Sequence, residues 1–292
     1  MSYDSRLERP GEQTVTSIQE TETGNFASPR WLLCAPSSVT VVSWNINRGL
    51  KLQGVMEFLS RARADIILLQ EADLNARRTH HLNVAREISQ KLQLNYVFGR
   101  EFQELSQGTR ASPAFHGQAT LSRWPLSNPR IIRFQKQSNF WRPHWFIPEI
   151  DPFQERLGGR MALVSDASIA GKTIITYNLH LESRSDDQLR ESQLAEILAD
   201  ARQYSAATPV LLAGDFNLDA SGGNAAAAIH QAQFQGAFAD QHLATTPNTF
   251  FEDGRAIDWI FSRGPVRPDE PQVHRSVKAS DHYPLSIALH FV

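Results

Sequence analysis

The stretch Pro209-Val-Leu-Leu-Ala-Gly-Asp-Phe-Asn-Leu-Asp219 constrains the fold more than any other segment. Its apolar run, residues 210–213, is short and lies between a proline and Gly214, which predicts a strand covered on both faces. Gly214 allows a sharp turn, so Asp215 and Asn217 are expected to emerge together where the strand stops. An ordinary capped turn has the same pattern, so the other strand ends decide between the two interpretations.

Other predicted strands also carry polar side chains at their ends. Short apolar runs with strand composition recur at residues 40–44, 65–71, 173–181, 255–261 and 285–291. Strand ends in α/β proteins are rigid platforms on which reactive groups are commonly found. The polar residues at these ends are Asn45, Glu71, Asn178, His180, Asp258, Asp281 and His282.

Helical periodicity separates the predicted strands. Apolar residues recur at helical spacing within residues 52–59, 81–92 and 185–201, and Ser185 resembles the start of a capping box. This alternation predicts an α/β (α+β) protein. Residues 1–37 are polar and without apolar periodicity, so we expect a flexible leader there and one folded domain over residues 38–292.

Composition excludes several classes of protein. The 292 residues are 41% hydrophobic, which is enough for a substantial core, and the formal net charge of -2 argues against a protein that coats nucleic acid by bulk charge. A single cysteine, Cys34, excludes an intramolecular disulfide and fits a reducing compartment. No apolar stretch is long enough to span a bilayer, so we expect a cytoplasmic monomer without a transmembrane segment.

Seven motifs occur in order along the chain. They are Trp44-Asn-Ile-Asn47, Gln70-Glu71, Leu121-Ser-Arg123, Asn178-Leu-His-Leu181, Gly214-Asp-Phe-Asn217, Ile257-Asp258 and Ser280-Asp-His282. Together they resemble the endonuclease/exonuclease/phosphatase superfamily, which includes deoxyribonuclease I, abasic-site endonucleases, neutral sphingomyelinases, inositol polyphosphate 5-phosphatases and tyrosyl-DNA phosphodiesterases. The resemblance extends from about Val39 to the end of the chain. It implies a four-layered α/β sandwich, in which two central mixed β-sheets are flanked by helices.

The resemblance also implies a divalent metal ion. Glu71 would be the leading ligand, with Asp281 and Asn45 as further oxygen donors. Such oxygen ligands suit a hard cation, Mg²⁺, for which Mn²⁺ can substitute. The sequence has no cluster of cysteine and histidine ligands, which disfavours zinc.

Four of the polar residues would act on the attacking water and the phosphate. By resemblance, Asp215 would orient or deprotonate the water, and Asn217 would donate hydrogen bonds to the phosphoryl oxygens. Asp258 would fix the tautomer of His282 and stabilise its protonated form. The sequence leaves open whether Asp215 or His282 is the base.

Four further residues would bind the substrate. His180 would bind the phosphate or assist the leaving group, while Asn45, Arg160 and Arg190 would contact phosphate oxygens. Arginine suits this role because its planar guanidinium donates several hydrogen bonds to an anion. Arginines also pair with structural carboxylates, so both interpretations of Arg160 and Arg190 remain open.

The sequence supports a phosphodiester substrate but leaves its class open. Asn47 stands where abasic-site endonucleases and tyrosyl-DNA phosphodiesterases usually carry Asp, and His180 also departs from the abasic-site enzymes. Residues 135–159 form an irregular segment rich in aromatic and basic residues, which could stack bases or contact lipid. DNA or RNA is marginally favoured. A phospholipid, sphingomyelin or inositol phosphate, with peripheral lipid contact, is the alternative, and a catalytically silent binding scaffold is a third hypothesis.

Overall fold

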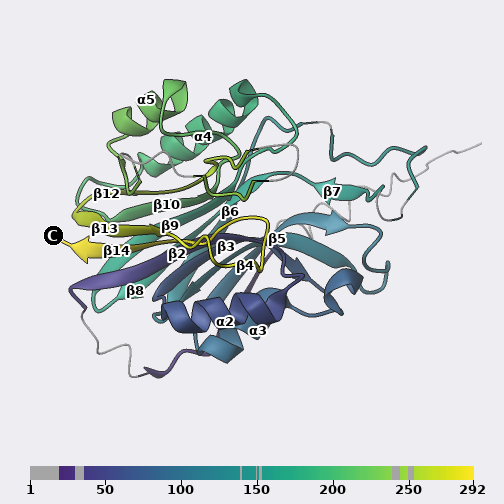
Figure 1. The fold of residues 1–292 in the computed structure, drawn as a ribbon, viewed down its shortest axis with the longest axis horizontal. Helices are drawn as coiled ribbons and strands as arrows, with labels where there is room; N and C mark the ends of the chain where they lie inside the picture. The colour runs from purple at the N-terminus through teal and green to yellow at the C-terminus, as the bar shows by residue number, and fades with distance from the viewer. Residues whose placement is uncertain are drawn as a thin grey trace, which may run out of the picture.

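The chain forms two β-sheets that pack face to face between two layers of helices (Figure 1). Helices α2 (Leu52–Ala62) and α3 (Val84–Leu92) cover one sheet, whereas α4 (Asp187–Ala201) and α5 (Gly223–Gln231) cover the other. This is the four-layered α/β sandwich expected from the sequence. The computed structural model describes residues 20–29, 36–138, 140–148, 150, 153–238, 244–248 and 253–292.

The first sheet has eight strands. They are β1 (Thr21–Asn25), β2 (Ser38–Arg48), β3 (Ile66–Leu74), β4 (Asn95–Glu104), β5 (Ala114–Ser122), β7 (Arg156–Gly158), β13 (Val266–Val273) and β14 (Leu285–Phe291). Their order is β1-β4-β5-β3-β2-β14-β13, and β7 pairs with the later part of β4. Strands β2 and β3, which α2 connects, are parallel, and the other pairs are antiparallel.

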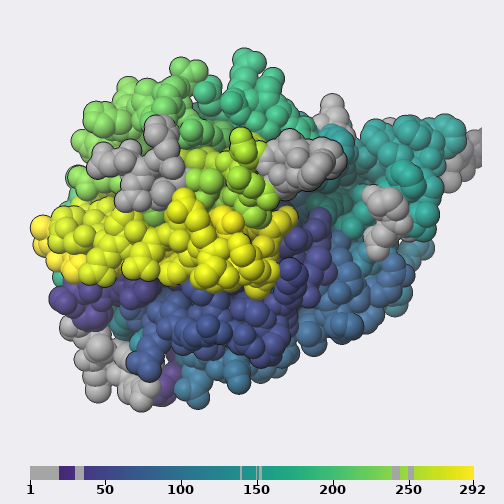
Figure 2. Space-filling model, in the orientation of Figure 1, coloured from purple at the N-terminus to yellow at the C-terminus, as the bar shows by residue number. Residues whose placement is uncertain are grey.

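The second sheet has six strands. They are β6 (Leu126–Arg133), β8 (Met161–Ile169), β9 (Lys172–His180), β10 (Val210–Asp215), β11 (Gln235–Gly236) and β12 (Asp258–Arg263), in the order β11-β12-β10-β9-β8-β6. Strands β9 and β10, which α4 connects, are parallel. The segment between β6 and β7 extends beyond the sheets, as the teal projection at the right of Figure 2 shows. Among the described residues, no helix combines the length and apolar character that a membrane crossing needs.

A buried amide joins the two sheets within the core. Asn178, on β9, donates to the backbone oxygens of Leu69 at 3.0 Å and Ala119 at 2.9 Å in the facing sheet. Its own oxygen accepts from Gln70 at 2.7 Å. Because a buried polar group without a partner is costly, these bonds favour one alignment of the sheets. They therefore hold the ends of β3 and β9 in a fixed relative position.

Strand register brings the polar strand ends together. Asp215, the last residue of β10, pairs with His180 on one side and with Asp258 on the other. In the first sheet, Asn45 pairs with Gln70, the residue before Glu71. Backbone pairing alone thus collects these residues at one end of the sandwich.

The structure differs from the sequence expectation near the amino terminus. We expected a flexible leader over residues 1–37, but residues 21–25 form β1 and pair with β4. The contacts of β1 are polar, because Glu22 accepts hydrogen bonds from Tyr96 and Asn83. Such a strand has no apolar alternation for the sequence to reveal. The other leader residues at 1–19 and 30–35, including Cys34, lie outside the described residues.

The start of α4 also differs by one residue from the expected cap. We expected a capping box that begins at Ser185, but Asp186 is the residue that caps the helix, and its carboxylate accepts from the backbone N–H of Leu189 at 3.1 Å. A carboxylate at this position also interacts favourably with the positive end of the helix dipole. The sequence pattern located the helix but not its exact first turn.

Candidate active site

The turn after β10 uses backbone conformations that few residues adopt. Gly214 has a φ of +147°, and a Cβ there would lie 2.0 Å from the carbonyl oxygen of Leu179. Asn217 has a φ of +51°, and its backbone N–H donates to Oδ1 of Asp215 at 2.9 Å. The turn thereby fixes the Asp215 carboxylate at the strand end.

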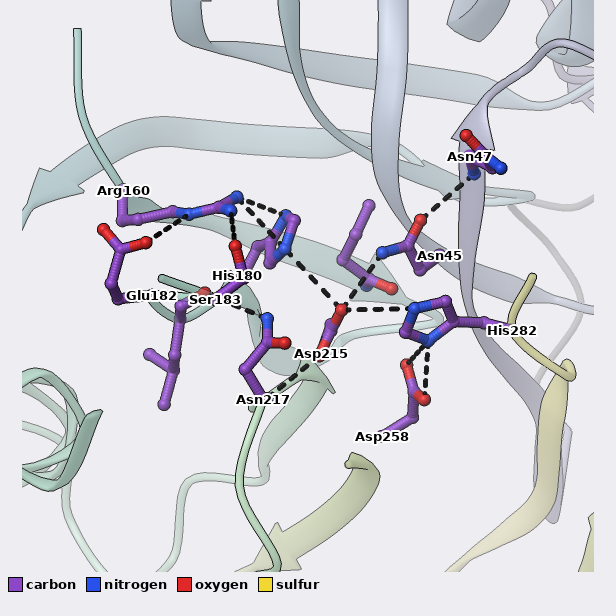
Figure 3. A network of polar contacts seen from close by, with 12 residues as sticks. Asn45, Asn47, Arg160, His180, Glu182, Ser183, Asp215, Asn217, Asp258 and His282 are labelled. Carbon is purple, nitrogen blue, oxygen red and sulfur yellow. Dashed lines mark hydrogen bonds and ion pairs between the residues drawn. The ribbon is translucent and has the colours of Figure 1, made fainter. Parts of the chain in front are cut away.

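The second carboxylate oxygen of Asp215 lies at the centre of the polar cluster (Figure 3). Asn45 donates its side-chain N–H to this oxygen at 3.0 Å. The Nε2 atoms of His180 and His282 lie 3.6 and 3.7 Å from it. Both histidine distances exceed the length of a hydrogen bond, so the oxygen can still accept from a water or a substrate.

A carboxylate supports His282 on its far side. The Nδ1 atom of His282 lies 2.8 and 3.1 Å from the two carboxylate oxygens of Asp258. Thr245 donates its hydroxyl to the same carboxylate at 2.6 Å. Burial alone would lower the pKa of His282, but Asp258 and Asp215 raise that pKa to about 10. His282 is therefore protonated on both ring nitrogens at neutral pH.

His180 is supported in a similar way from β4. Glu101 accepts a hydrogen bond from Arg160 at 2.8 Å, and the same guanidinium nitrogen lies 2.9 Å from Nδ1 of His180. The same guanidinium nitrogen lies 3.0 Å from Nε2, so Arg160 positions the imidazole without selecting which ring nitrogen carries a proton. Burial alone would raise the pKa of Glu101, but Arg160 and His180 lower it to about 2. Glu101 is thus an ionised, buried carboxylate.

Glu71 has a different environment from the carboxylates around Asp215. It lies in a β-bulge of β3, with a φ of +54°, and is partly exposed. Within the described ranges, no hydrogen bond or ion pair joins its side chain to another residue. Burial alone would raise the pKa of Glu71, but surrounding cationic groups, led by His116 and Arg48, hold it well below its usual range. An ionised carboxylate without a protein partner fits a divalent cation.

Two further oxygen donors belong to the same end of the sandwich. The side-chain oxygen of Asn45 accepts one hydrogen bond, from the backbone N–H of Asn47 at 3.1 Å, and retains a second lone pair. Asp281 is exposed, and it is linked to Asn45 through Ser280, whose hydroxyl lies 2.7 Å from the Asn45 backbone oxygen and 3.1 Å from the Asp281 carboxylate. This donor chemistry, carboxylate and amide oxygen, fits Mg²⁺ or Mn²⁺.

A second group can also hold a metal ion. Asp215, Asp258 and His282 place potential ligand atoms within 4.8 Å of one another. In the structure, however, Asp258 and His282 direct their polar atoms at each other, and the protonated ring has no lone pair to offer. The site at Glu71 needs no such deprotonation, so we favour it for the cation.

The two arginines expected to bind phosphate are engaged by the protein. Arg160 is 2% exposed, and it contacts Glu101 and His180 as well as the hydroxyl of Ser183 at 2.8 Å. Arg190 reaches the end of β9, but its guanidinium donates to the backbone oxygen of Glu182 at 2.7 Å and to others in the loop that follows. In the structure both arginines contact the protein, Arg160 beside His180 and Arg190 along the loop after β9, and their contact with phosphate stays a prediction.

Asn217 is also partly engaged. One side-chain N–H donates to the backbone oxygen of Leu181 at 3.2 Å, which leaves the second hydrogen for another acceptor. Its side chain is held at the same strand end as Asp215. Asp281, in contrast, does not join the cluster around Asp215.

Sequence reasoning missed Glu101 and Thr245. Glu101 lies where the pairing of β4 with β5 shifts register, and a charged residue among buried ones was the indication of its role in the sequence. Thr245 comes from a loop that has no periodicity, and it reaches Asp258 only through the tertiary fold.

Comparisons with known proteins agree with this geometry. The model of the Endonuclease/Exonuclease/phosphatase family matches residues 42–282. No curated protein sequence matches the chain. Among solved structures, the endonuclease/exonuclease/phosphatase from Beutenbergia cavernae is 15% identical with a TM-score of 0.63, and the match covers 88% of this chain and 72% of that one.

Two named proteins share the fold at similar identity. The human Nocturnin catalytic domain with bound sulfate anion is 15% identical with a TM-score of 0.63, over 93% of this chain and 98% of that one. A humanized D. rerio TDP2 is 20% identical with a TM-score of 0.59, over 87% of this chain and all of that one, 100%. Because the family model spans most of the chain, the protein belongs to the endonuclease/exonuclease/phosphatase family, whose members are hydrolases that act on phosphoester bonds.

Proposed function

We propose that the protein is a phosphodiesterase that depends on a divalent cation, Mg²⁺ or Mn²⁺ in its place. The observation that carries this proposal is the Asp215 oxygen that accepts from Asn45 and lies between two histidines, each of which is supported by a carboxylate. A phosphodiester is anionic and expels an alkoxide. Its hydrolysis therefore needs an activated water, neutralisation of charge and a proton for the leaving group.

Two groups of residues suit the first two needs, an activated water and neutralisation of charge. Glu71, Asn45 and Asp281 would hold the cation, which when bound neutralises charge on the phosphoryl oxygens. Asp215 accepts a proton from the attacking water while the oxygen of that water forms a bond to phosphorus. We assign the base to Asp215 rather than His282, because a protonated imidazole has no lone pair to accept that proton.

His180 suits the third need, a proton for the leaving group. When the ester P–O bond breaks, the leaving oxygen requires a proton, and Nε2 of His180, next to Asp215, would donate it. Arg160 and Glu101 keep the imidazole in that orientation. His180 thus binds the phosphate or protonates the leaving group, and the second amide hydrogen of Asn217 is available to a phosphoryl oxygen.

The catalytic cluster does not select among phosphodiesters, because it contacts the group that all of them share. We retain DNA or RNA as the first class to test, since exposed rings beside arginines are able to stack bases. The sulfate bound to human Nocturnin, a tetrahedral anion like phosphate, supports an anion site in this fold. A lipid phosphodiester is the second candidate, and one observation, the exposure of the segment between β6 and β7, favours it.

A panel of substrates tests the proposal. It comprises single- and double-stranded DNA, abasic duplex, 5'-tyrosyl DNA, RNA, sphingomyelin and inositol phosphates, each with Mg²⁺ and with EDTA. We expect EDTA-sensitive turnover of at least one phosphodiester by the wild-type chain and loss of that turnover in His282→Ala. Silence on every substrate, with a folded chain, would instead favour a binding scaffold.

We also retain the expectation of a cytoplasmic monomer. Its support is limited to the sequence, which has one cysteine and no long apolar stretch. Sedimentation of the purified chain measures the oligomeric state directly.

A further inference from the structure

The segment between β6 and β7 exposes an unusual amount of apolar surface. The exposed fractions are 97% for Trp145, 65% for Phe146, 58% for Phe140, 56% for Phe153 and 54% for Ile150. Elsewhere among the described residues, the large hydrophobic side chains with comparable exposure are Leu50 and Val292. An exposed apolar patch of this kind marks an interaction surface. We call the exposed residues Trp145, Phe146, Ile150 and Phe153 the aromatic tip.

The base of this segment is fastened beside the active site. Trp141 donates its indole N–H to Glu182 at 2.8 Å, and its ring lies 5.8 Å from that of Phe102. The guanidinium of Arg160 lies 5.4 Å from the centre of the Trp141 ring. Because Arg160 also contacts His180, one residue separates the aromatic segment from the catalytic cluster. The base of the segment, at Trp141, therefore lies beside the catalytic cluster.

We propose that the aromatic tip docks on a lipid surface. The tip projects from the body of the molecule (Figure 2), so its partner must receive a convex apolar surface. The headgroup boundary of a bilayer does this without a preformed pocket, and tryptophan and phenylalanine are well suited to that boundary. Trp145 meets Phe146 edge to face at 5.8 Å, and together they form the most exposed part of the tip.

Single-stranded nucleic acid fits these observations less well. A base-stacking surface combines rings with a basic groove that follows the phosphates. Between β6 and β7 the sequence has two basic residues, Lys136 and Arg142, against three acidic ones, Glu149, Asp151 and Glu155, and the whole chain has a net charge of -2. We therefore expect attachment that is mainly apolar and only weakly sensitive to salt, whereas phosphate contacts would make it strongly salt-dependent.

This docking has a consequence for the class of substrate. That consequence rests on the proposed phosphodiesterase function. Phosphodiesters in lipid headgroups lie at the surface that the aromatic tip would enter. The tip would then concentrate the enzyme at that surface and bring His180 and Asp215 to the headgroups. The docking itself does not require catalysis, so the two proposals are separable by experiment.

Vesicle flotation tests the docking with the full-length chain. The vesicles are phosphatidylcholine alone and phosphatidylcholine with phosphatidylserine, each at low and high salt. The test variant is Trp145→Ser with Phe146→Ser. The control is Val292→Ser, which removes an apolar side chain that is 84% exposed at the opposite end of the molecule (Figure 1). Thermal unfolding checks that each variant is folded.

We expect the wild type and the control to float with both kinds of vesicle at both salt concentrations. The double variant should bind at least about tenfold more weakly. A wild type that stays in solution, or a double variant that floats equally well, would overturn the docking. Loss of binding to a single-stranded oligonucleotide, without loss of flotation, would reassign the tip to base stacking. Hydrolysis of soluble bis(4-nitrophenyl) phosphate by the wild type, with and without EDTA, tests the proposed function separately.

Discussion

His180 and His282 approach the same oxygen of Asp215, at 3.6 and 3.7 Å, and each is backed by a buried carboxylate. The carboxylate behind His282 is Asp258, at 2.8 Å, while Glu101 lies 3.7 Å behind His180. The two supports are not equivalent. Arg160 donates a hydrogen bond to Glu101 and also contacts His180, so its positive charge partly offsets the charge of the Glu101 carboxylate. The two histidines therefore have different supports while they face one acceptor.

Removing the charge of Asp215 should abolish most turnover. Asp215→Asn keeps the size of the side chain but cannot accept the proton of the attacking water, so we expect kcat to fall by about 10² to 10⁴. Steady-state hydrolysis of the preferred substrate with Mg²⁺ measures this. The matched control is Asp219→Asn, four residues later and exposed, whose carboxylate contacts only Ser221. A folded Asp215→Asn chain with near wild-type kcat would contradict the assigned role.

The pairing of His282 with Asp258 predicts a dependence of stability on alkaline pH. The pKa of His282 is raised from 6.5 to about 10, so its protonation contributes stability that is complete below pH 6.5. That contribution is lost as the pH rises through about 10. We compare the free energy of unfolding of the wild type with that of His282→Gln, both in EDTA, by urea titration. The difference between them should shrink from pH 6.5 to pH 10; a constant difference would show that His282 is not held in its protonated form.

The sequence predicted the layers and the residues that strand register collects. Asp215, His180 and Asp258 lie on paired strands, so any fold with these strands as neighbours brings them together. The apolar pattern predicts which segments are strands, whereas their arrangement in two packed sheets was implied by the resemblance to the family. The direction of Arg190 could not be predicted in the same way, since it depends on which backbone oxygens the loop after β9 presents.

Contacts that depend on packing between distant segments could not be predicted from the sequence. Glu101 and Arg160 are 59 positions apart in the chain. Glu101 lies on β4 of the first sheet, whereas Arg160 lies in the connection between β7 and β8. Strand β1 was missed for a related reason, because Glu22 makes polar contacts that leave no apolar pattern. Both cases involve polar residues whose partners the chain supplies only after folding.

Glu101 should be a positioning residue that acts through His180. Glu101→Gln leaves Arg160 without its closest buried counter-charge, so we expect the free energy of unfolding to fall by about 3 kcal/mol. Because the pKa of Glu101 is about 2, its contribution is present above pH 4.5 and is lost as the pH falls toward 2. Urea unfolding at neutral and acidic pH measures both effects. A positioning role further requires a shift in the pH profile of kcat, which a purely structural role would not produce. Glu57→Gln, a half-exposed site on α2, is the control.

The two candidate metal groups make opposite predictions for Glu71 and Asp258. If the cation binds at Glu71, then Glu71→Gln removes an ionised carboxylate that has no protein partner among the described residues. We then expect the Mn²⁺ dissociation constant to rise by about tenfold or more, because a hard cation loses its charged ligand. Asp258→Asn should change that constant little, since Asp258 is occupied by His282 and Thr245. Electron paramagnetic resonance of Mn²⁺ measures binding without turnover. The reverse order of effects would place the cation in the group of Asp215, Asp258 and His282, and would make His282 a ligand that binds only after it loses its proton.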